Sequence, residues 1–158
     1  MPARRHALAA VSFAALLLGL TACQQPSPGV TLVSSGSSLH TAAVNFCRDG
    51  KYLTKVDGNE CPSDGKRVNV LHVRQGDTVG LDVDKALTET GWYLYDLDHQ
   101  QSFGYEDQHY LSFQADFSNR PVPGFINLEV RQVAHKPNND QDLPRVLGQW
   151  KLQLAQKQ

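Results

Sequence analysis

Methionine and cysteine are scarce in this sequence, and their scarcity excludes several metal functions. Met1 is the single methionine among 158 residues, and there are three cysteines. A blue-copper site requires a free cysteine thiolate, two histidines and usually an axial methionine. Met1 lies in an N-terminal segment that we expect to be removed. Neither electron-transfer copper nor methionine-rich copper(I) handling therefore fits the composition.

An excess of charge of one sign is also missing. The chain carries 15 Lys and Arg against 16 Asp and Glu. Removal of Arg4 and Arg5 with the N-terminal segment changes this balance to 13 − 16 = −3. No basic cluster is available to bind a nucleic-acid backbone or a surface of anionic lipid. We therefore expect no nucleic-acid partner.

Catalytic motifs are absent or incomplete. The hydrolase motif G-x-S-x-G does not occur. Ser63 and Lys66 match the S-x-x-K motif of penicillin-recognising enzymes, but the partner motifs S-D-N and K-T-G are missing. Gly65, between them, favours a solvated loop instead. The sequence predicts neither an enzyme nor a cofactor.

The N-terminus is the most informative stretch that is present. Arg4 and Arg5 precede an uncharged apolar run over residues 7–18, and Leu-Thr-Ala then leads into Cys23. This pattern is typical of a secretory signal, because the run is too short to span a membrane. The end of the run resembles the bacterial lipobox. The alternative is an ordinary signal peptide with an incidental cysteine.

The lipobox resemblance implies that Cys23 receives a diacylglyceryl group and that the signal is cut before it. Two or three acyl chains, palmitate among them, would hold the protein firmly on a membrane. We predict an extracytoplasmic lipoprotein of the cell membrane or outer membrane. Residues 1–22 form the signal, 23–38 a flexible tether and 39–158 one domain. Residues 30–33 are the one apolar cluster of the tether and are alternatively a first edge strand.

Two cysteines remain if Cys23 carries lipid. Cys47 and Cys61 then form an even pair in an oxidising compartment, where a disulfide is expected. The alternative is a redox or metal pair, which no C-x-x-C spacing supports.

Short stretches of alternating apolar and polar residues fill the mature chain and predict β-strands. Residues 68–73 and 79–83 flank a turn at 75–77 and predict a hairpin, and residues 99–107 predict a polar loop. We expect one helical turn over residues 85–90, capped by Asp84 and ended by Gly91. The expected strands are 42–47, 52–56, 68–73, 79–83, 92–97, 110–117, 126–131 and 146–154.

About seven short strands joined by Gly, Pro and Asn turns predict an all-β fold. We favour an immunoglobulin-like antiparallel β-sandwich. Trp92 and Trp150 are candidates for its core, with Phe113 and Leu128 nearby. The loop between Cys47 and Cys61 is too short for the inter-sheet bridge of antibody domains, so this disulfide is expected to join neighbouring elements at one end.

Three features together resemble an uncharacterised group of actinobacterial lipoproteins, a domain of unknown function. They are the lipobox at Cys23, the spacing of Cys47 and Cys61, and the stretch 73–79 followed by Trp92. The resemblance spans most of the mature domain. The group has no established activity, so the resemblance implies no functional residues.

Two candidate sites lie between residues 93 and 110. Imidazole and carboxylate groups suit zinc or copper(II), so His99 and His109 are candidate metal ligands beside acidic neighbours. The alternative is an acidic, solvent-facing loop. Aromatic side chains in the same region are a candidate partner surface, unless they cap one end of the sandwich. They are Tyr93, Tyr95, Phe103, Tyr105 and Tyr110.

We therefore predict a binding or interaction module, anchored to the membrane through Cys23, with an envelope protein or lipid as its partner. The alternative is a metal-binding envelope protein that uses His99 and His109.

Overall fold

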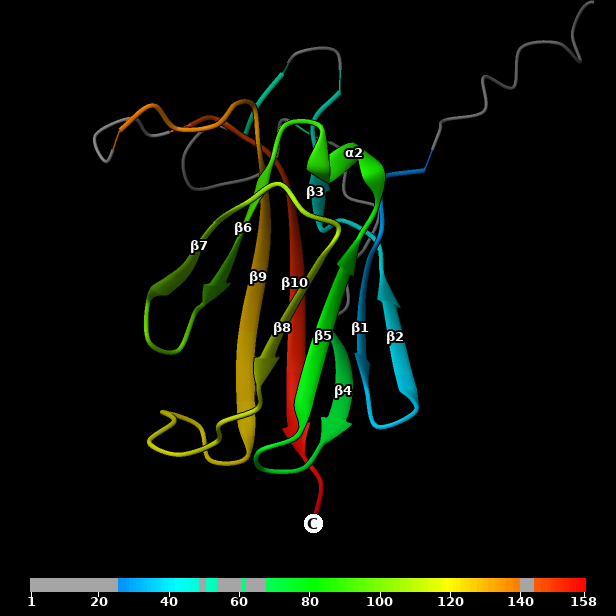
Figure 1. Ribbon diagram of the computed structural model, residues 1–158, viewed down its shortest axis with the longest axis vertical. Helices are drawn as coiled ribbons and strands as arrows, with labels where there is room; N and C mark the ends of the chain where they lie inside the picture. Colours follow the sequence, from blue (N-terminus) through cyan, green and yellow to red (C-terminus); the bar gives the residue numbers. More distant parts are fainter. Residues whose placement is uncertain (1–25, 49–50, 54–60, 62–67, 140–143) are drawn as a thin grey trace, which may run out of the picture.

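The computed structural model describes residues 26–48, 51–53, 61, 68–139 and 144–158. These residues form two β-sheets packed face to face around one core (Figure 1). The first described residues lie toward one end of the elongated domain and the C-terminus lies at the other. The strands of the smaller sheet, in spatial order, are β2 (Ser37–Thr41), β1 (Val30–Ser34), β5 (Thr78–Val83) and β8 (Tyr110–Gln114).

The larger sheet is built around its two longest strands. β9 and β10 pair antiparallel along most of their length, and β6 and β7 continue the sheet beyond β9. At the other edge, β10 pairs with β3 and, in parallel, with β4. The strands are β3 (Asn45–Phe46), β4 (Asn69–Val73), β6 (Trp92–Asp96), β7 (Gln101–Glu106), β9 (Phe125–Val133) and β10 (Val146–Gln156).

The prediction of an all-β sandwich is confirmed. The strands are arranged in an immunoglobulin-like order, with β1, β5 and β8 in the places of strands A, B and E. β6, β7, β9 and β10 take the places of C, C′, F and G. No strand D lies beside β8 among the described residues, which include the whole connection from β7 to β8.

Two buried tryptophans lie at the centre of the core, as expected. Trp92 and Trp150 are fully buried, and both indole N–H groups donate to backbone carbonyl oxygens, of Gln108 at 3.0 Å and of Pro28 at 2.9 Å. These bonds satisfy a polar group that burial would otherwise leave unpaired. Leu128 is buried beside them, whereas Phe113 packs on the core from a half-buried position.

The tether prediction is wrong for residues 30–38. β1 pairs with β2 on one side and β5 on the other, so it is an interior strand, and Val30 and Leu32 are fully buried. The pattern of residues 30–34 is short, but Val30 and Leu32 project from the same face of the strand, and their packing on the core decides its structure.

Several local predictions also need correction. Residues 68–83 do not form a hairpin, because β4 pairs with β10 and β5 lies in the opposite sheet. Residues 101–106 form strand β7 rather than a loop, and the strand at 42–47 shortens to β3. Residues 51–53 are not a strand, and 54–56 lie outside the described residues. The described part contains ten strands rather than about seven.

The predicted helical turn is present as α2 (Lys85–Thr88). Gly91 ends it at φ 91° and donates its N–H to the carbonyl of Leu87 at 2.8 Å. Asp84 occupies the N-cap position, as predicted, but its side chain makes no capping bond. Its carboxylate instead accepts from the backbone N–H of Gly29 at 2.6 Å and ties the helix to the start of β1.

The predicted disulfide is confirmed between Cys47 and Cys61, whose Cα atoms are 4.9 Å apart. Cys47 directly follows β3, and its N–H donates to the carbonyl of Leu147 at 2.8 Å. The bridge therefore ties Cys61 to the start of β10.

Candidate functional site

Five aromatic residues were predicted to form a partner surface. Three of them form a cluster on the outer face of the larger sheet. Tyr93 lies between Tyr95 and Tyr105, with ring centroids 5.9 and 5.7 Å away. The register of β6 with β7 places Tyr93 opposite Tyr105. We name the outer surface of β7, β6 and β9 around these three rings the tyrosine face.

Two cations lie over the rings of the tyrosine face. The guanidinium of Arg131 is 4.2 Å from the centroid of Tyr95, and the ammonium of Lys136 is 5.4 Å from that of Tyr105. Arg131 comes from β9, where it lies opposite Tyr93. Cations at these distances are attracted by the negative face of the ring. The rings and cations are therefore held in place before any ligand binds.

A buried carboxylate fixes the orientation of Arg131. Glu129 precedes Arg131 by two residues on β9, so both side chains project from the same face. The Nε group of Arg131 pairs with Oε1 of Glu129, which also accepts from Nε2 of Gln149 at 3.4 Å. Asn45 donates to Gln149 in turn. This polar row extends the tyrosine face across β10 to β3.

The surroundings of Tyr105 raise the pKa of its hydroxyl and provide it with a hydrogen-bond acceptor. Burial, followed by the nearby charge of Asp107, raises the pKa of the Tyr105 phenol above its usual value. Its hydroxyl donates to the carbonyl of Thr90 at 3.3 Å. Tyr105 therefore contributes a neutral phenol to the tyrosine face at physiological pH.

The other two predicted aromatic residues lie elsewhere. Phe103 packs on Phe113 of β8, with 5.6 Å between ring centroids, on the inner side of β7. Tyr110 lies on the outer face of the smaller sheet, over Gly80. The prediction of one aromatic surface from all five residues is therefore wrong. Strand alternation sends neighbouring residues to opposite faces, and the sequence cluster spans three strands.

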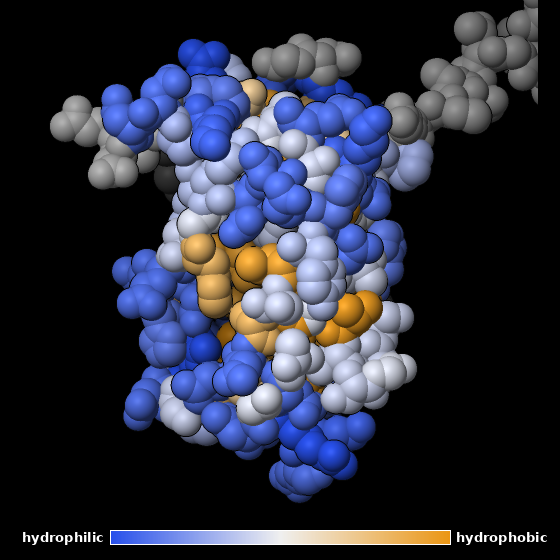
Figure 2. All heavy atoms as spheres, in the orientation of Figure 1, coloured by the Kyte–Doolittle hydropathy of each residue, from blue (hydrophilic) through white to orange (hydrophobic). Residues whose placement is uncertain are grey.

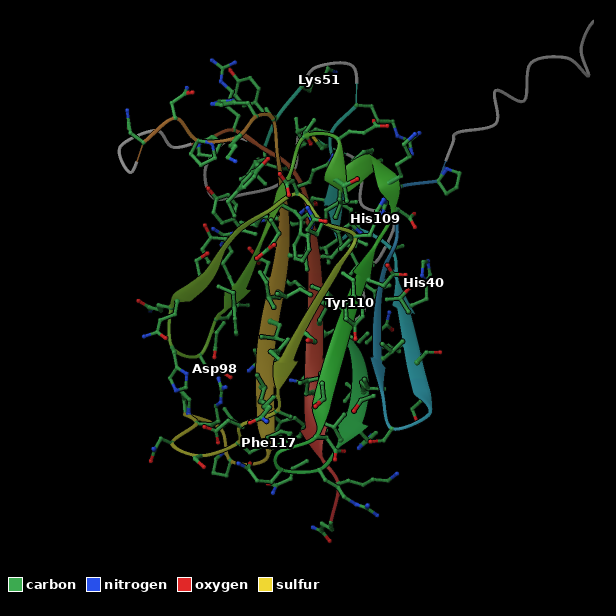
Figure 3. All side chains as sticks on the ribbon, viewed as in Figure 1. His40, Lys51, Asp98, His109, Tyr110 and Phe117 are labelled. Carbon is green, nitrogen blue, oxygen red and sulfur yellow. A yellow bond between two sulfur atoms is a disulfide. The ribbon has the colours of Figure 1, made fainter. Side chains whose placement is uncertain are left out.

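The predicted metal ligands are separated by the length of β6. His99 follows the end of β6, where Nδ1 lies 3.1 Å from Oδ2 of Asp96. His109 lies near the start of β6, with Nδ1 3.2 Å from the carbonyl of Val83. Figure 3 shows Asp98, the neighbour of His99, well apart from His109. The two histidines do not share a site, and the described residues hold no group of three or more potential metal ligands.

The acidic neighbours of His99 form a buried ion cluster. Nη1 of Arg120 lies 2.5 Å from Asp96 and 3.7 Å from Asp98, and all three side chains are less than 10% exposed. Asp98 also accepts from the backbone and side-chain N–H groups of Asn127, at 2.9 and 2.8 Å. The cluster joins the β6–β7 turn to β9 and to the segment before it, so its role is structural.

Asp96 and Asp116, at this end of the domain, have lowered pKa values. Burial raises the pKa of Asp96, but the hydrogen bonds and charge of Arg120 and the N–H of His99 outweigh it, and the pKa falls below 3.8. The side-chain amide of Gln75 and the N–H of Ser118 lower the pKa of Asp116 to about 2.

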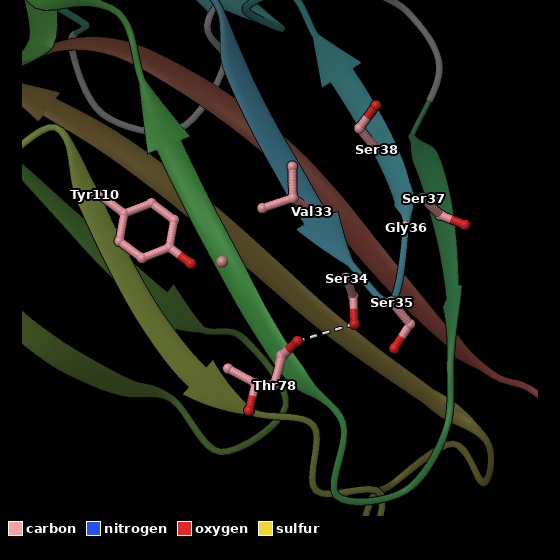
Figure 4. A pocket seen from close by; sticks show the side chains of 9 residues that line it. Val33, Ser34, Ser35, Gly36, Ser37, Ser38, Thr78 and Tyr110 are labelled. Atoms are coloured by element: carbon pink, nitrogen blue, oxygen red, sulfur yellow. Dashed lines mark hydrogen bonds between the residues drawn. The ribbon is translucent and has the colours of Figure 1, made fainter.

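A shallow depression of about 380 Å³ lies on the outer face of the smaller sheet (Figure 4). The serines of the β1–β2 turn line it together with Thr78, Gly80 and Tyr110. Ser34 donates to the carbonyl of Thr78 at 2.9 Å, and Ser35 donates to Asp77 at 3.3 Å. The hydroxyl groups of Ser34 and Ser35 thus serve the local structure, and no charged side chain lines the depression.

The predicted lipidation site, Cys23, and the signal over residues 1–22 lie outside the described residues. Within the part of the chain that the structure describes, no helix is both long and apolar enough to span a bilayer.

Comparisons of the chain with protein families, with curated proteins and with solved structures find no match. The resemblance to actinobacterial lipoproteins therefore stays a prediction.

Sequence reasoning missed the charged residues that organise both sites. Arg131 and Glu129 follow each other at strand spacing, a signal that they share a face. Arg120 follows strand β8 and directly precedes the proline-containing stretch 121–123. No local pattern connects it with Asp96, which is 24 residues away.

Proposed function

We propose that this protein is a lipid-anchored binding module of the bacterial cell envelope, with the tyrosine face as its recognition surface for a partner protein. The single observation that carries the proposal is the cluster of Tyr93, Tyr95 and Tyr105 with Arg131 stacked on it. Tyrosine and arginine are enriched at the energetic centres of protein interfaces.

The packing of the cluster supports binding rather than a purely structural role. A tyrosine loses little conformational freedom on binding, and these rings are already ordered by one another and by Arg131. Preorganisation lowers the entropic cost of association. A set of rings on the outside of a sheet is broad and flat, which suits a macromolecule better than a small ligand in a cavity.

The short distance between Cys23 and β1 restricts where the partner lies. Residues 23 to 30 span at most about 25 Å when fully extended. An anchor at Cys23 would therefore keep the sandwich close to the bilayer, and the partner is expected at the membrane surface.

The anchor is tested by Cys23→Ser in the full-length chain. We expect the wild-type protein in the membrane fraction, with a mass increased by acyl chains, and the variant without either property. Mass spectrometry of the N-terminal peptide and membrane fractionation provide the two readouts. An unmodified Cys23 in the mature protein would reject the anchor and leave the recognition surface untested by this experiment.

The recognition surface is tested by a photoreactive phenylalanine analogue at Tyr95, introduced into the full-length protein in its own membrane. The matched control carries the analogue at Thr31, on the outer face of the smaller sheet. We expect one cross-linked protein from position 95, its loss when Arg131→Ala is added, and no such product from position 31. Equal products from both positions would reject the tyrosine face.

A further inference from the structure

Strand β8 leaves one backbone edge open. β8 pairs with β5 alone among the described strands. At its two ends, Val83 donates to the carbonyl of His109 and Ala115 donates to the carbonyl of Asp77, both at 2.9 Å. Backbone groups alternate in direction along an antiparallel strand. The N–H and C=O groups of residues 110, 112 and 114 therefore point away from β5, toward the open edge.

The same edge exposes apolar side chains. Leu111 and Phe113, on the inner face of β8, remain half-buried, and Phe103 of β7 is 46% exposed beside Phe113. Figure 2 shows apolar surface along β8 on the side of β7. An immunoglobulin-like strand D would cover this edge, but only residues 107–109 connect β7 to β8.

The edge lacks the features that usually prevent strand pairing. Charged residues, proline and bulges protect the edge strands of most soluble proteins. β8 reads Tyr-Leu-Ser-Phe-Gln and has a regular register with β5. By contrast, β7 carries Glu106 and a register shift near Gly104, whose φ is 109°. β2 lies against β4, where Asn69 donates to Thr41 at 2.8 Å.

The sequence of β8 is self-complementary about its central residue. A two-fold axis at Ser112 pairs Ser112 with its copy and Tyr110 with Gln114, and each pair exchanges two N–H···O bonds. Leu111 then lies opposite Phe113 of the second copy on the inner face. Apolar residues meet apolar residues, polar residues meet polar ones, and no like charges oppose each other.

We propose that two copies of this chain pair antiparallel through β8, about a two-fold axis at Ser112, and join their smaller sheets into one continuous sheet. A second copy of the chain is the partner that the observations favour at the open edge of β8. Its own β8, paired about Ser112, places apolar residues opposite apolar residues and polar residues opposite polar ones. The proposal does not depend on the lipid anchor or on the tyrosine face. One short strand pair buries little area compared with stable interfaces, so we expect weak association.

Single cysteines trap such a dimer and report its register. In the pairing proposed, the two Cα atoms of residue 112 are about 5.5 Å apart, within the range that a disulfide bridges. The two copies of residue 110, or of residue 114, are about 14 Å apart. Under mild oxidation of cells that produce the full-length protein, Ser112→Cys is expected to form a disulfide-linked dimer.

The matched controls are Tyr110→Cys, Gln114→Cys and Asp82→Cys, the last of which lies on β5 opposite Tyr110. We expect no dimer from any of these single variants, and a dimer from the double variant Tyr110→Cys with Gln114→Cys. A dimer formed equally by Ser112→Cys and Asp82→Cys would overturn the proposal. So would a disulfide from position 112 to a different protein.

Charge at the axis provides a second test. Like charges directly opposite each other destabilise a strand pair. In the double-cysteine background, Ser112→Lys or Ser112→Glu alone is expected to abolish the dimer, because residue 112 meets its own copy. Coexpression of the two charged variants is expected to restore it. Recovery shows that both variants fold, and failure to recover in folded protein contradicts the two-fold pairing.

Discussion

The indole N–H of Trp150 donates a hydrogen bond of 2.9 Å to the carbonyl oxygen of Pro28, 122 residues away. Trp150 is fully buried, so this bond holds the segment before the first strand against the core. β1 follows at once and lies between β2 and β5. The folded domain therefore begins before residue 39, and the N-terminal segment is part of it.

A chain that begins at Leu39 is expected not to fold. It loses β1, and with it the burial of Val30 and Leu32, each worth about 1.5–3 kcal/mol, and it leaves one edge of β5 unpaired. Net stability of a domain is only about 5–15 kcal/mol. Circular dichroism during heating should show a cooperative transition for a chain that begins at Gln24. A similar transition for the chain from Leu39 would contradict the role of β1.

Loss of the disulfide is expected to lower the free energy of unfolding by about 3 kcal/mol on the chain-entropy account. The bridge closes a loop with a sequence separation of 14. Urea denaturation of the oxidised and reduced protein measures the difference. The double variant Cys47→Ser with Cys61→Ser is the control, and its midpoint should not respond to reductant. If the double variant unfolded at the same urea midpoint as the oxidised wild type, the bridge would not stabilise the domain.

Much of the sandwich follows from local patterns. β5, β6, β8, β9 and β10 were predicted close to their observed positions, because β6 is rich in aromatic and apolar residues and the other four strands alternate between apolar and polar residues. The disulfide was predictable because Cys47 and Cys61 are the two cysteines that follow the predicted signal and Cys23. Trp92 and Trp150 were predictable core residues because large apolar side chains inside strands have few other places to go.

The errors share a physical cause, which is that pairing partners are not local. The turn at 75–77 has ordinary turn chemistry, with Gly76 at φ 80° and the carboxylate of Asp77 accepting from the N–H of Arg74. Such a turn connects two strands of one sheet or of two sheets equally well. β7 carries polar residues on an exposed edge, so it has no burial pattern to detect. The tyrosine face depends on the register between β6, β7 and β9, which no single stretch encodes.

Two glycines in strands are expected to differ sharply in their tolerance of alanine. A Cβ atom at Gly148 would lie 2.7 Å from Cη2 of Trp150, which is fully buried and cannot move away. A Cβ atom at Gly80 would lie 2.2 Å from the hydroxyl of Tyr110, which is 53% exposed and free to rotate outward. We expect Gly148→Ala to cost about 1–3 kcal/mol and Gly80→Ala about 0.5 kcal/mol or less.

Urea denaturation of the two variants provides the comparison. Adding Tyr110→Ala to Gly80→Ala should remove the remaining cost, whereas the same addition should leave Gly148→Ala unchanged because the two sites share no contact. Equal destabilisation by both glycine substitutions would show that the exposed ring of Tyr110 is held as firmly as the core.

The ion pair between Asp96 and Arg120 is expected to stabilise the domain in a pH-dependent way. Asp96→Asn leaves Arg120, with its side chain 8% exposed, paired with the more distant Asp98, while its Nε still donates to the backbone carbonyl of Asp116. Breaking a buried pair by neutralising one partner typically costs about 3–5 kcal/mol, and we expect a value near the lower limit because Asp98 remains. Asp82→Asn, on an exposed side chain, is the matched control and should change stability by about 0.5 kcal/mol or less.

The pKa of Asp96 in the folded protein is lower than its ordinary value of 3.8, because Arg120 and the N–H of His99 outweigh the effect of burial. A lowered folded pKa stabilises the folded state above the ordinary pKa, and this contribution is lost as the pH falls through the folded value. The stability difference between wild type and Asp96→Asn should therefore be constant near neutral pH and narrow below about pH 3.8. Asp116, with a pKa of about 2, titrates in both proteins, so its effect largely cancels in the difference. Urea denaturation between pH 7 and pH 2.5 measures this difference, and a gap that widens on acidification would contradict a charged, paired Asp96.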